Sequence, residues 1–140
     1  LKTAQAQEIP VTIVSDGFDY VIKNLLSRKL PGSVYQKLEI FSNKMEVTSH
    51  SVKVSFPAEP CEHGCANCKP RIINARRATG DRILFIGDGM SDRYAAEVAD
   101  LTFAKKKLLD YCVNRQLPHR EYSNFHVIQE WISSKERITC

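Results

Sequence analysis

The 140-residue sequence has no apolar run that approaches the length of a membrane-spanning helix. Its first residues lack the apolar core of a secretory signal, so nothing in them predicts export. Its charge is nearly balanced, with 20 basic against 16 acidic residues, and a formal net charge of +4 is too small to indicate nucleic acid. No internal repeat or low-complexity segment is found. We therefore expect a cytoplasmic protein with neither a membrane nor a nucleic-acid partner.

The composition is that of a folded domain. Hydrophobic residues make up 43% of the chain, enough to bury a core, and the length is that of one ordinary domain. Cysteine occurs five times, an odd number, and three of the five lie in one short segment. This usage fits a reducing compartment better than a disulfide framework. We expect a single domain over residues 1–140.

A short apolar run followed by acidic residues lies at the centre of the chain. Residues 83–86 are typical of a strand buried on both faces, and the Gly-Asp-Gly that follows allows a sharp turn. Ser91 has the position of an N-cap for the next helix. Asp88 and Asp92, at the carboxyl end of a strand, can share one Mg²⁺. The alternative is that both carboxylates only cap the helix, since acidic groups are favoured in a first turn.

The periodicity of apolar residues predicts alternating strands and helices. The expected strands cover residues 11–14, 38–41, 45–47, 52–56, 83–86 and 101–104, with 45–47 and 52–56 forming a hairpin. The expected helices cover 18–30, open at Pro70, follow Ser91, include Leu108, Leu109 and Cys112, and begin after the cap Ser123. The buried sides of two of them are expected at Ile72, Ile73 and Ala75, and at Phe125, Ile128, Trp131 and Ile132. This order predicts an α/β fold with a parallel sheet flanked by helices.

Three chemical groups lie at the ends of these elements. Ser15 follows the first strand, Lys69 precedes a helix, and Asp88 with Asp92 follows the central strand. Such a set suits a phosphoryl group, because a hydroxyl and a cation neutralise its non-bridging oxygens and a metal bridges phosphate and protein. The basic run 105–107 is predicted to be solvated surface or to line the entrance for an anionic substrate.

These residues, in this order, resemble the motifs of the haloacid dehalogenase superfamily of phosphatases. Gly87-Asp88-Gly89-Met90-Ser91-Asp92 resembles its fourth motif, Val14-Ser15-Asp16-Gly17-Phe18 its second, and Lys69 its third. The most similar branch is the phosphoserine-phosphatase-like one, especially the methionine-salvage enol-phosphate phosphatases, over about residues 10–131. The resemblance implies a Rossmann-like parallel sheet flanked by helices, with a β-hairpin insertion.

The resemblance also implies a reaction and a role for each matching residue. The reaction is the Mg²⁺-dependent hydrolysis of a small phosphorylated metabolite through an aspartyl-phosphate. The implied site residues are Asp88 and Asp92 for Mg²⁺, Ser15, Asp16 and Gly17 for the phosphate, and Lys69 for phosphate and nucleophile, with Lys69 and Asp88 as catalytic groups.

One motif of the family is missing from the 140 residues. The first motif is an apolar strand ending in Asp-x-Asp, which supplies the nucleophile, and no two aspartates of this sequence have that spacing. In the family this strand lies between the strands that 11–14 and 83–86 form here, whose inner edges would otherwise be unpaired. We therefore expect the C-terminal part of a longer phosphatase core, with the nucleophile and the cap supplied by a missing N-terminal segment. A second copy could also complete the sheet edge. The 140 residues alone are then expected to be inactive.

A cysteine-rich segment directly precedes Lys69. It offers Zn²⁺ ligands at short spacing: Cys61, His63, Cys65 and Cys68, with Cys112, His50 or His126 as other sources of a fourth ligand. The same cysteine spacing occurs in radical iron–sulfur enzymes that use S-adenosylmethionine, whose barrel is not predicted here. The remaining interpretation is a loop of reduced cysteines that positions Lys69.

Two functions other than phosphatase follow from these alternatives. The first is a catalytically inactive relative of the family that binds metal or phosphate. The second is a structural zinc-binding interaction domain in which the segment 61–68 is the functional part. Mg²⁺-dependent activity of the full gene product would distinguish the phosphatase from both.

Overall fold

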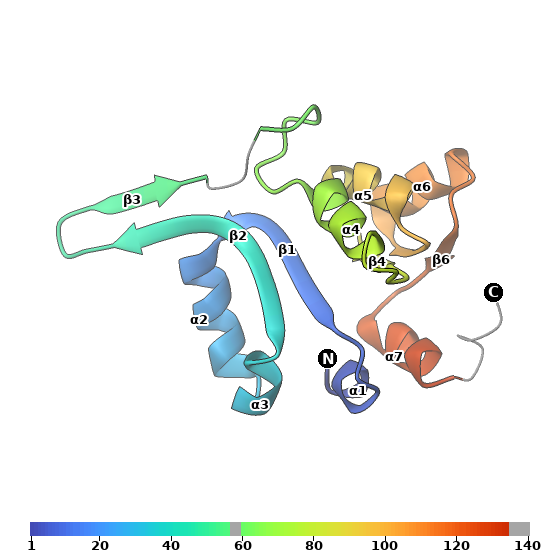
Figure 1. Ribbon diagram of the computed structural model, residues 1–140, viewed down its shortest axis with the longest axis horizontal. Helices are drawn as coiled ribbons and strands as arrows, with labels where there is room; N and C mark the ends of the chain where they lie inside the picture. Colours follow the sequence, from blue (N-terminus) through green and yellow to red (C-terminus); the bar gives the residue numbers. More distant parts are fainter. Residues whose placement is uncertain (57–59, 135–140) are drawn as a thin grey trace. The chain divides into compact units, whose positions relative to one another are not determined.

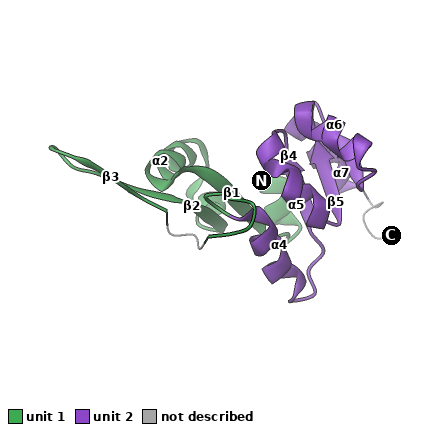
Figure 2. Cartoon of the chain, turned by 90° about the horizontal axis from the view of Figure 1, so that it is seen from above, with its two compact units in different colours: residues 1–67 green, residues 68–140 purple. Residues whose placement is uncertain are grey.

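The computed structural model describes residues 1–56 and 60–134. The chain divides into two compact units, residues 1–67 and 68–140, which Figure 2 colours green and purple. Each unit is mixed α/β with parallel strand pairs and flanking helices, so the predicted fold class is confirmed at this level. The expected single domain stays a prediction. Within the described residues, no helix combines the length and the apolar character needed to cross a membrane.

The first unit is built on a three-stranded sheet of order β1-β2-β3 (Figure 1). Its elements are α1 (Lys2–Ala6), β1 (Val11–Phe18), α2 (Asp19–Lys29), α3 (Gly32–Tyr35), β2 (Leu38–Val47) and β3 (Val52–Ser55). β1 and β2 are parallel, with Val11 opposite Leu38, and β2 and β3 are antiparallel, with Val47 opposite Val52. The segments 38–41 and 45–47, predicted as two strands, form one continuous strand because Ser42 and Asn43 stay in the sheet and are buried.

The second unit contains a fully parallel sheet of order β4-β5-β6. Its elements are α4 (Lys69–Arg77), β4 (Leu84–Gly87), the 3₁₀ turn η1 (Met90–Asp92), α5 (Arg93–Val98), β5 (Leu101–Ala104), α6 (Lys106–Asn114), β6 (His119–Glu121) and α7 (Phe125–Ser133). Strand β6 was not predicted, because a three-residue polar edge strand has no apolar alternation to reveal it.

The core of the second unit consists of two apolar clusters. One joins α5, β5 and α6 through Ala96, Ala104, Leu108 and Cys112, and the other joins β5 to α7 through Phe103, Tyr122 and Ile128. The rings of Phe103 and Trp131 meet edge to face at 5.4 Å. The predicted helix containing Leu108 and Cys112 is confirmed, since both side chains are completely buried.

Four details of the predicted helices are wrong. Ser91 is not an N-cap, because the chain first forms the 3₁₀ turn η1. The last helix is capped by Asn124 and not Ser123, since the Asn124 side chain accepts a hydrogen bond from the His126 amide at 2.8 Å. Ala75 and Phe125 are exposed, because the buried side of each helix is narrower than the spacing of its apolar residues indicated.

Candidate active site

The end of β4 leaves no room for a side chain at position 87 unless its neighbours shift. Gly87 is buried, and a Cβ atom there would lie 2.7 Å from the carboxylate of Asp92 and 2.9 Å from side-chain carbons of Leu108 and Phe85. Those distances are below any normal contact, so a larger residue would displace the carboxylate or the core. The glycine that marks this turn in the sequence is therefore required by packing.

The carboxylate of Asp92 closes this turn. One of its oxygens, Oδ2, accepts hydrogen bonds from the amides of Asp88 at 3.1 Å and Gly89 at 3.2 Å. It is a side-chain cap of the kind that satisfies the free amides at the start of a helix. The capping role predicted as an alternative therefore describes the carboxylate of Asp92. Asp88 takes part in this cap only through its backbone amide, which donates to Asp92.

The other oxygen of Asp92 binds Lys69. Lys69 is the first residue of α4, is buried, and donates from Nζ to Asp92 Oδ1 at 2.7 Å. The two side chains are only 11% and 12% exposed, so the charges are largely removed from water and each depends on the other. Lys69, Asp88 and Asp92, which the sequence predicted as site residues, are thus brought together within the second unit.

Asp88 presents a carboxylate to solvent beside this buried pair. Its side chain is 46% exposed, and Oδ2 accepts a hydrogen bond from Lys106 Nζ at 2.8 Å. That hydrogen bond, with the charges of Lys106 and Lys105, outweighs desolvation and lowers the pKa of the Asp88 carboxyl. Asp88 is therefore an accessible carboxylate at the carboxyl end of a parallel sheet, where open α/β folds bind their ligands.

The basic run 105–107 takes part in this site. Lys106 binds Asp88, and the Lys105 ammonium lies 4.8 Å above the ring of the buried Tyr122. Burial, together with the negative charges of Asp88 and Asp92, raises the pKa of the Tyr122 hydroxyl. The Lys106 side chain is 69% exposed, so the prediction of solvated surface fits it. Its hydrogen bond to Asp88 is an additional contact that the sequence pattern did not predict.

Of the two carboxylates at this site, that of Asp88 is suited to bind a hard divalent cation and that of Asp92 is not. Asp88 has an exposed carboxylate, and Mg²⁺ is commonly bound by one or two protein carboxylates with water and phosphate oxygens. Both oxygens of Asp92 already accept hydrogen bonds, from Lys69 and from the backbone of the turn. The arrangement therefore fits direct binding by Asp88, with Asp92 holding the turn and the lysine.

The predicted phosphate-binding residues lie in the first unit, in a bulge of β1. Val14 is paired with Phe41 and Phe18 with Asn43, so three residues of β1 stand against a single residue of β2. The three residues of β1 that have no paired residue in this register are Ser15, Asp16 and Gly17. Ser15 Oγ accepts a hydrogen bond from the Gly17 amide at 3.1 Å, which orders the bulge internally.

Two buried amides fix this bulge. Asn43, which is fully buried, donates to the backbone oxygen of Asp16 at 2.7 Å. Asn67 donates from its side chain to the backbone oxygen of Ser15 at 2.9 Å and from its backbone to Asp16 Oδ1 at 3.0 Å. A further bond joins Asn67 to Asn43 at 3.3 Å. The sequence analysis missed Asn43, whose only signal is an amide inside an apolar strand pattern.

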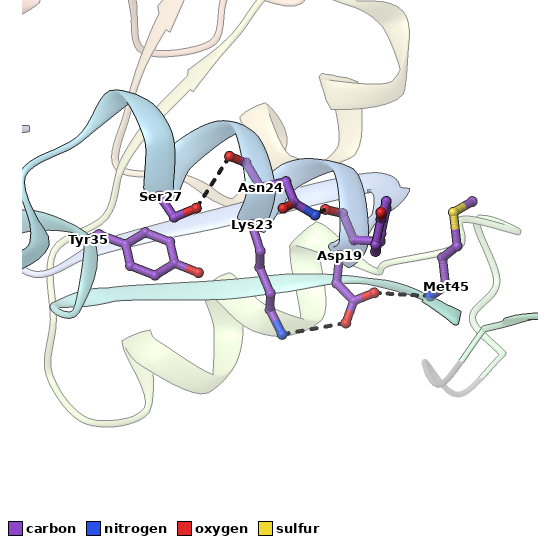
Figure 3. Close-up of a pocket in the computed structure, with 7 residues that line it drawn as sticks. Asp19, Lys23, Asn24, Ser27, Tyr35 and Met45 are labelled. Atoms are coloured by element: carbon purple, nitrogen blue, oxygen red, sulfur yellow. Dashed lines mark hydrogen bonds and ion pairs between the residues drawn. The ribbon is translucent and has the colours of Figure 1, made fainter. Parts of the chain in front are cut away.

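A polar groove lined by α2, α3 and β2 lies in the first unit (Figure 3). Asp19 accepts from the Met45 amide at 3.0 Å and pairs with Lys23 and Lys44, and the Met45 hydrogen bond is the main cause of its lowered pKa. The groove residues are Asp19, Tyr20, Lys23, Asn24, Ser27, Tyr35 and Met45. Asp19 joins α2 to β2, so the polar contacts of this groove serve to hold the helix against the sheet.

No family model matches the chain, but its sequence is similar to those of several proteins named as phosphatases. It is 32% identical over 121 residues to a 2-hydroxy-3-keto-5-methylthiopentenyl-1-phosphate phosphatase of Bacillus pumilus, covering 84% of this chain and 50% of the relative. A phosphatase of the same name from Bacillus cereus is 31% identical over 133 residues, or 92% of this chain and 58% of the relative. The polyol phosphate phosphatase PYP1 of Saccharomyces cerevisiae is 34% identical over 136 residues, or 87% of this chain and 55% of the relative.

The chain thus spans about half the length of the curated relatives that it matches. The matches extend over most of its own residues and include both the methionine-salvage phosphatases named from the motifs and a polyol phosphate phosphatase. The chain is therefore a homologue of these phosphatases over most of its length, as its resemblance to the haloacid dehalogenase phosphatases of the methionine-salvage type indicated.

Proposed function

We propose that the protein to which these 140 residues belong hydrolyses a small phosphomonoester. The homologous proteins are named as phosphatases of phosphorylated small molecules, which supports this class of reaction. The observation that carries the proposal is the buried Lys69–Asp92 pair, which fixes the turn holding the exposed carboxylate of Asp88. This arrangement resembles a phosphate site more than a simple helix cap, because a cap does not need a buried lysine.

Each predicted residue has a role in this proposal. Asp88 binds Mg²⁺, which when bound supplies electrostatic stabilisation of the phosphate oxygens. Lys69 neutralises charge on the phosphate and on the nucleophile, and Asp92 keeps the lysine in place and holds the turn. Ser15, with Asp16 and Gly17, is the proposed phosphate-binding turn of the first unit, as the resemblance implies. The ionised state of Asp88 at neutral pH agrees with its lowered pKa.

The nucleophile is proposed to lie outside these residues. No two aspartates of the chain have the Asp-x-Asp spacing, and the relatives are about twice as long as the matched region. The aspartyl-phosphate route therefore needs an aspartate from another segment, and we expect the 140 residues alone to be inactive. The missing motif also favours a second candidate, a module that binds Mg²⁺ or phosphate without turnover.

Phosphate release from p-nitrophenyl phosphate by the complete gene product tests the proposal. We expect activity that requires Mg²⁺, and Asp88→Asn should lower kcat/KM by about 10²-fold or more, because one carboxylate of the metal site is lost. Asp110→Asn is the matched control, since Asp110 is an exposed aspartate on α6, and it should leave kcat/KM within about twofold.

Binding measurements distinguish the two candidates. Titration calorimetry that shows Mg²⁺ binding lost in Asp88→Asn, together with no turnover of any tested ester, would establish the non-catalytic module. Any turnover would exclude the non-catalytic module. Turnover that is unchanged by Asp88→Asn and by Lys69→Met would contradict the roles proposed for Asp88 and Lys69, because neither residue would then contact the phosphate or its metal.

A further inference from the structure

The segment 61–68 has a structure that the phosphatase proposal does not use. Gly64 adopts a left-handed conformation with φ of +63°, and its amide donates to the backbone oxygen of Cys61 at 3.0 Å. This tight turn folds the segment back on itself. As a result the sulfur atoms of Cys61 and Cys65 lie 3.0 Å apart, with both side chains partly buried.

The sulfur atoms of Cys61 and Cys65 lie slightly closer together than two thiolate ligands of one Zn²⁺. Thiolates on a tetrahedral Zn²⁺ lie about 3.8 Å apart, because each Zn–S bond is about 2.3 Å long. The Cys61–Cys65 pair therefore needs to open by only about 0.8 Å to bind zinc. Within the part of the chain that the structure describes, no disulfide involves Cys61, Cys65 or Cys68.

The third thiol follows from the local sequence. Cys68 comes after Cys65 with two residues between, the knuckle spacing of many zinc sites. Three residues of chain extend over at most about 10 Å, so the local chain keeps Cys68 within reach of an ion bound at Cys65. Among the described residues, 1–56 and 60–134, Cys61, Cys65 and Cys68 are the group of three side chains suited to hold a metal ion.

Neighbouring contacts hold the C-terminal end of this segment in place. Asn67 is bound through its backbone to Asp16 and through its side chain to Ser15 and Asn43. The next residue, Cys68, is the N-cap of α4 and is buried. The position of the backbone beside Cys68 is therefore fixed by hydrogen bonds, which favours a preformed ligand over a mobile one.

We propose that Cys61, Cys65 and Cys68 bind one structural Zn²⁺ as thiolates, with His63 as the fourth ligand. His63 is chosen from the sequence, because it lies two residues from both Cys61 and Cys65, whereas the group of possible ligands that the structure brings together consists of the three sulfur atoms. The site joins the segment to the residue that directly precedes Lys69, so bound zinc stabilises the start of α4. Binding displaces the thiol protons, and affinity therefore increases with pH.

Metal content of the complete protein, purified without chelator under reducing conditions, tests the proposal. We expect about one zinc per chain by plasma mass spectrometry, and Cys61→Ser, Cys65→Ser and Cys68→Ser should each weaken binding by more than about tenfold. Cys112→Ala is the matched control: Cys112 is a thiol buried in the core of the second unit, where burial raises its pKa, and its loss should leave the zinc content unchanged.

Cobalt substitution identifies the ligands without relying on variants that fail to fold. Exchange of Co²⁺ into the wild-type protein should give thiolate-to-cobalt charge-transfer bands and the visible bands of a tetrahedral site. In His63→Ala the charge-transfer bands should remain while affinity falls by about tenfold. Unchanged affinity in His63→Ala would overturn the assignment of the fourth ligand.

Two results would overturn the site as a whole. One is a zinc content far below one per chain in wild-type protein that also takes up no Co²⁺ after reduction. The other is a peptide map of freshly purified, unreduced protein in which Cys61 and Cys65 are joined by a disulfide. Both measurements are independent of phosphatase activity, so the zinc site and the phosphatase can fail separately.

Discussion

The two units contain the same strand–turn–helix arrangement but are stabilised differently. In the second unit, β5 and its neighbouring helices surround completely buried apolar side chains such as Phe103 and Leu108. In the first unit the only completely buried side chain is that of Asn43, within the described residues 1–56 and 60–67. The comparison indicates that apolar packing dominates in the second unit and hydrogen bonding around β1 and β2 in the first.

The helices of the two units show the same contrast. α6 buries Leu108 and Cys112 completely, whereas α2, which is longer, has no buried residue. Val21 and Leu25 of α2 are more than half exposed. The sequence predicted an amphipathic helix in both places, and only the tertiary contacts separate a core helix from one that presents apolar side chains to solvent.

The largest expected difference concerns two phenylalanines. Phe103→Ala should destabilise the second unit by about 3–5 kcal/mol, because it removes a 1%-exposed ring packed against Trp131. Phe56→Ala in the first unit should cost less than about 1 kcal/mol, because that ring is 60% exposed. Urea unfolding followed by the fluorescence of Trp131, the only tryptophan, measures the first value, and hydrogen exchange of residues 38–55 measures the second. Equal losses would mean that the first unit has an apolar core around Phe56.

A second test compares two glycines. Gly87→Ala should destabilise the second unit by about 2 kcal/mol, since the new Cβ would meet the Asp92 carboxylate and the side chain of Leu108. Gly32→Ala, at the start of α3 with nothing within 4 Å of the added atom, should change stability by less than about 0.5 kcal/mol or raise it slightly. Urea midpoints of both variants provide the measurement. A neutral Gly87→Ala would show that the turn can move without affecting the core.

The third prediction concerns the hydrogen bonds of the first unit. Asn43→Ala should destabilise β1 by about 1–2 kcal/mol, because the backbone oxygen of Asp16 loses its buried donor. Amides of residues 11–18 should exchange faster with solvent as a result. Asn24→Ala, which removes an exposed amide from α2, is the control and should change exchange very little. Unchanged exchange of 11–18 in Asn43→Ala would argue against a polar network as the main support of the bulge.

The smallest expected effect is on acid stability. The pKa of Asp19 is lowered mainly by the Met45 amide, and that of Asp88 mainly by the hydrogen bond from Lys106. A carboxyl whose pKa is lowered by folding stabilises the protein at pH values above its unfolded-state pKa, which is about 4. This stabilisation is lost as the pH falls through the lower pKa of the folded state. In Mg²⁺-free buffer, Asp19→Asn and Asp88→Asn should each reduce this loss by less than about 1 kcal/mol, because solvent screens both groups. Acid titrations of stability that are as steep in both variants as in the wild type would contradict it.

Much of the fold followed from local patterns in the sequence. The apolar runs at 11–14, 83–86 and 101–104 lie in β1, β4 and β5, and the acidic turn comes at the carboxyl end of β4 as predicted. Such runs are typical of strands buried on both faces, but the predicted burial is wrong for β4, in which Ile86 is 36% exposed. Element ends were less predictable, as Asn124 in place of Ser123 shows, because neighbouring polar residues compete for the same cap.

The contacts of the candidate site were less accessible to sequence reasoning. Nothing in the pattern of the chain paired Lys106 with Asp88, or gave Asn43 its place behind the bulge of β1. These contacts join residues that are 18 to 27 positions apart in the sequence. Local periodicity carries no information about such pairs, since it reports only the neighbours of a residue along its own helix or strand.

The sequence by itself determined most of the helices and strands, the position of the Gly-Asp-Gly turn and the set of residues that resembles a phosphatase. Only the tertiary structure decided that both carboxylate oxygens of Asp92 accept hydrogen bonds, from Lys69 and from the backbone of the turn, while the carboxylate of Asp88 remains exposed to solvent. The reason is physical: residue type and spacing fix what a side chain can bind, but packing and burial fix which of its partners it meets.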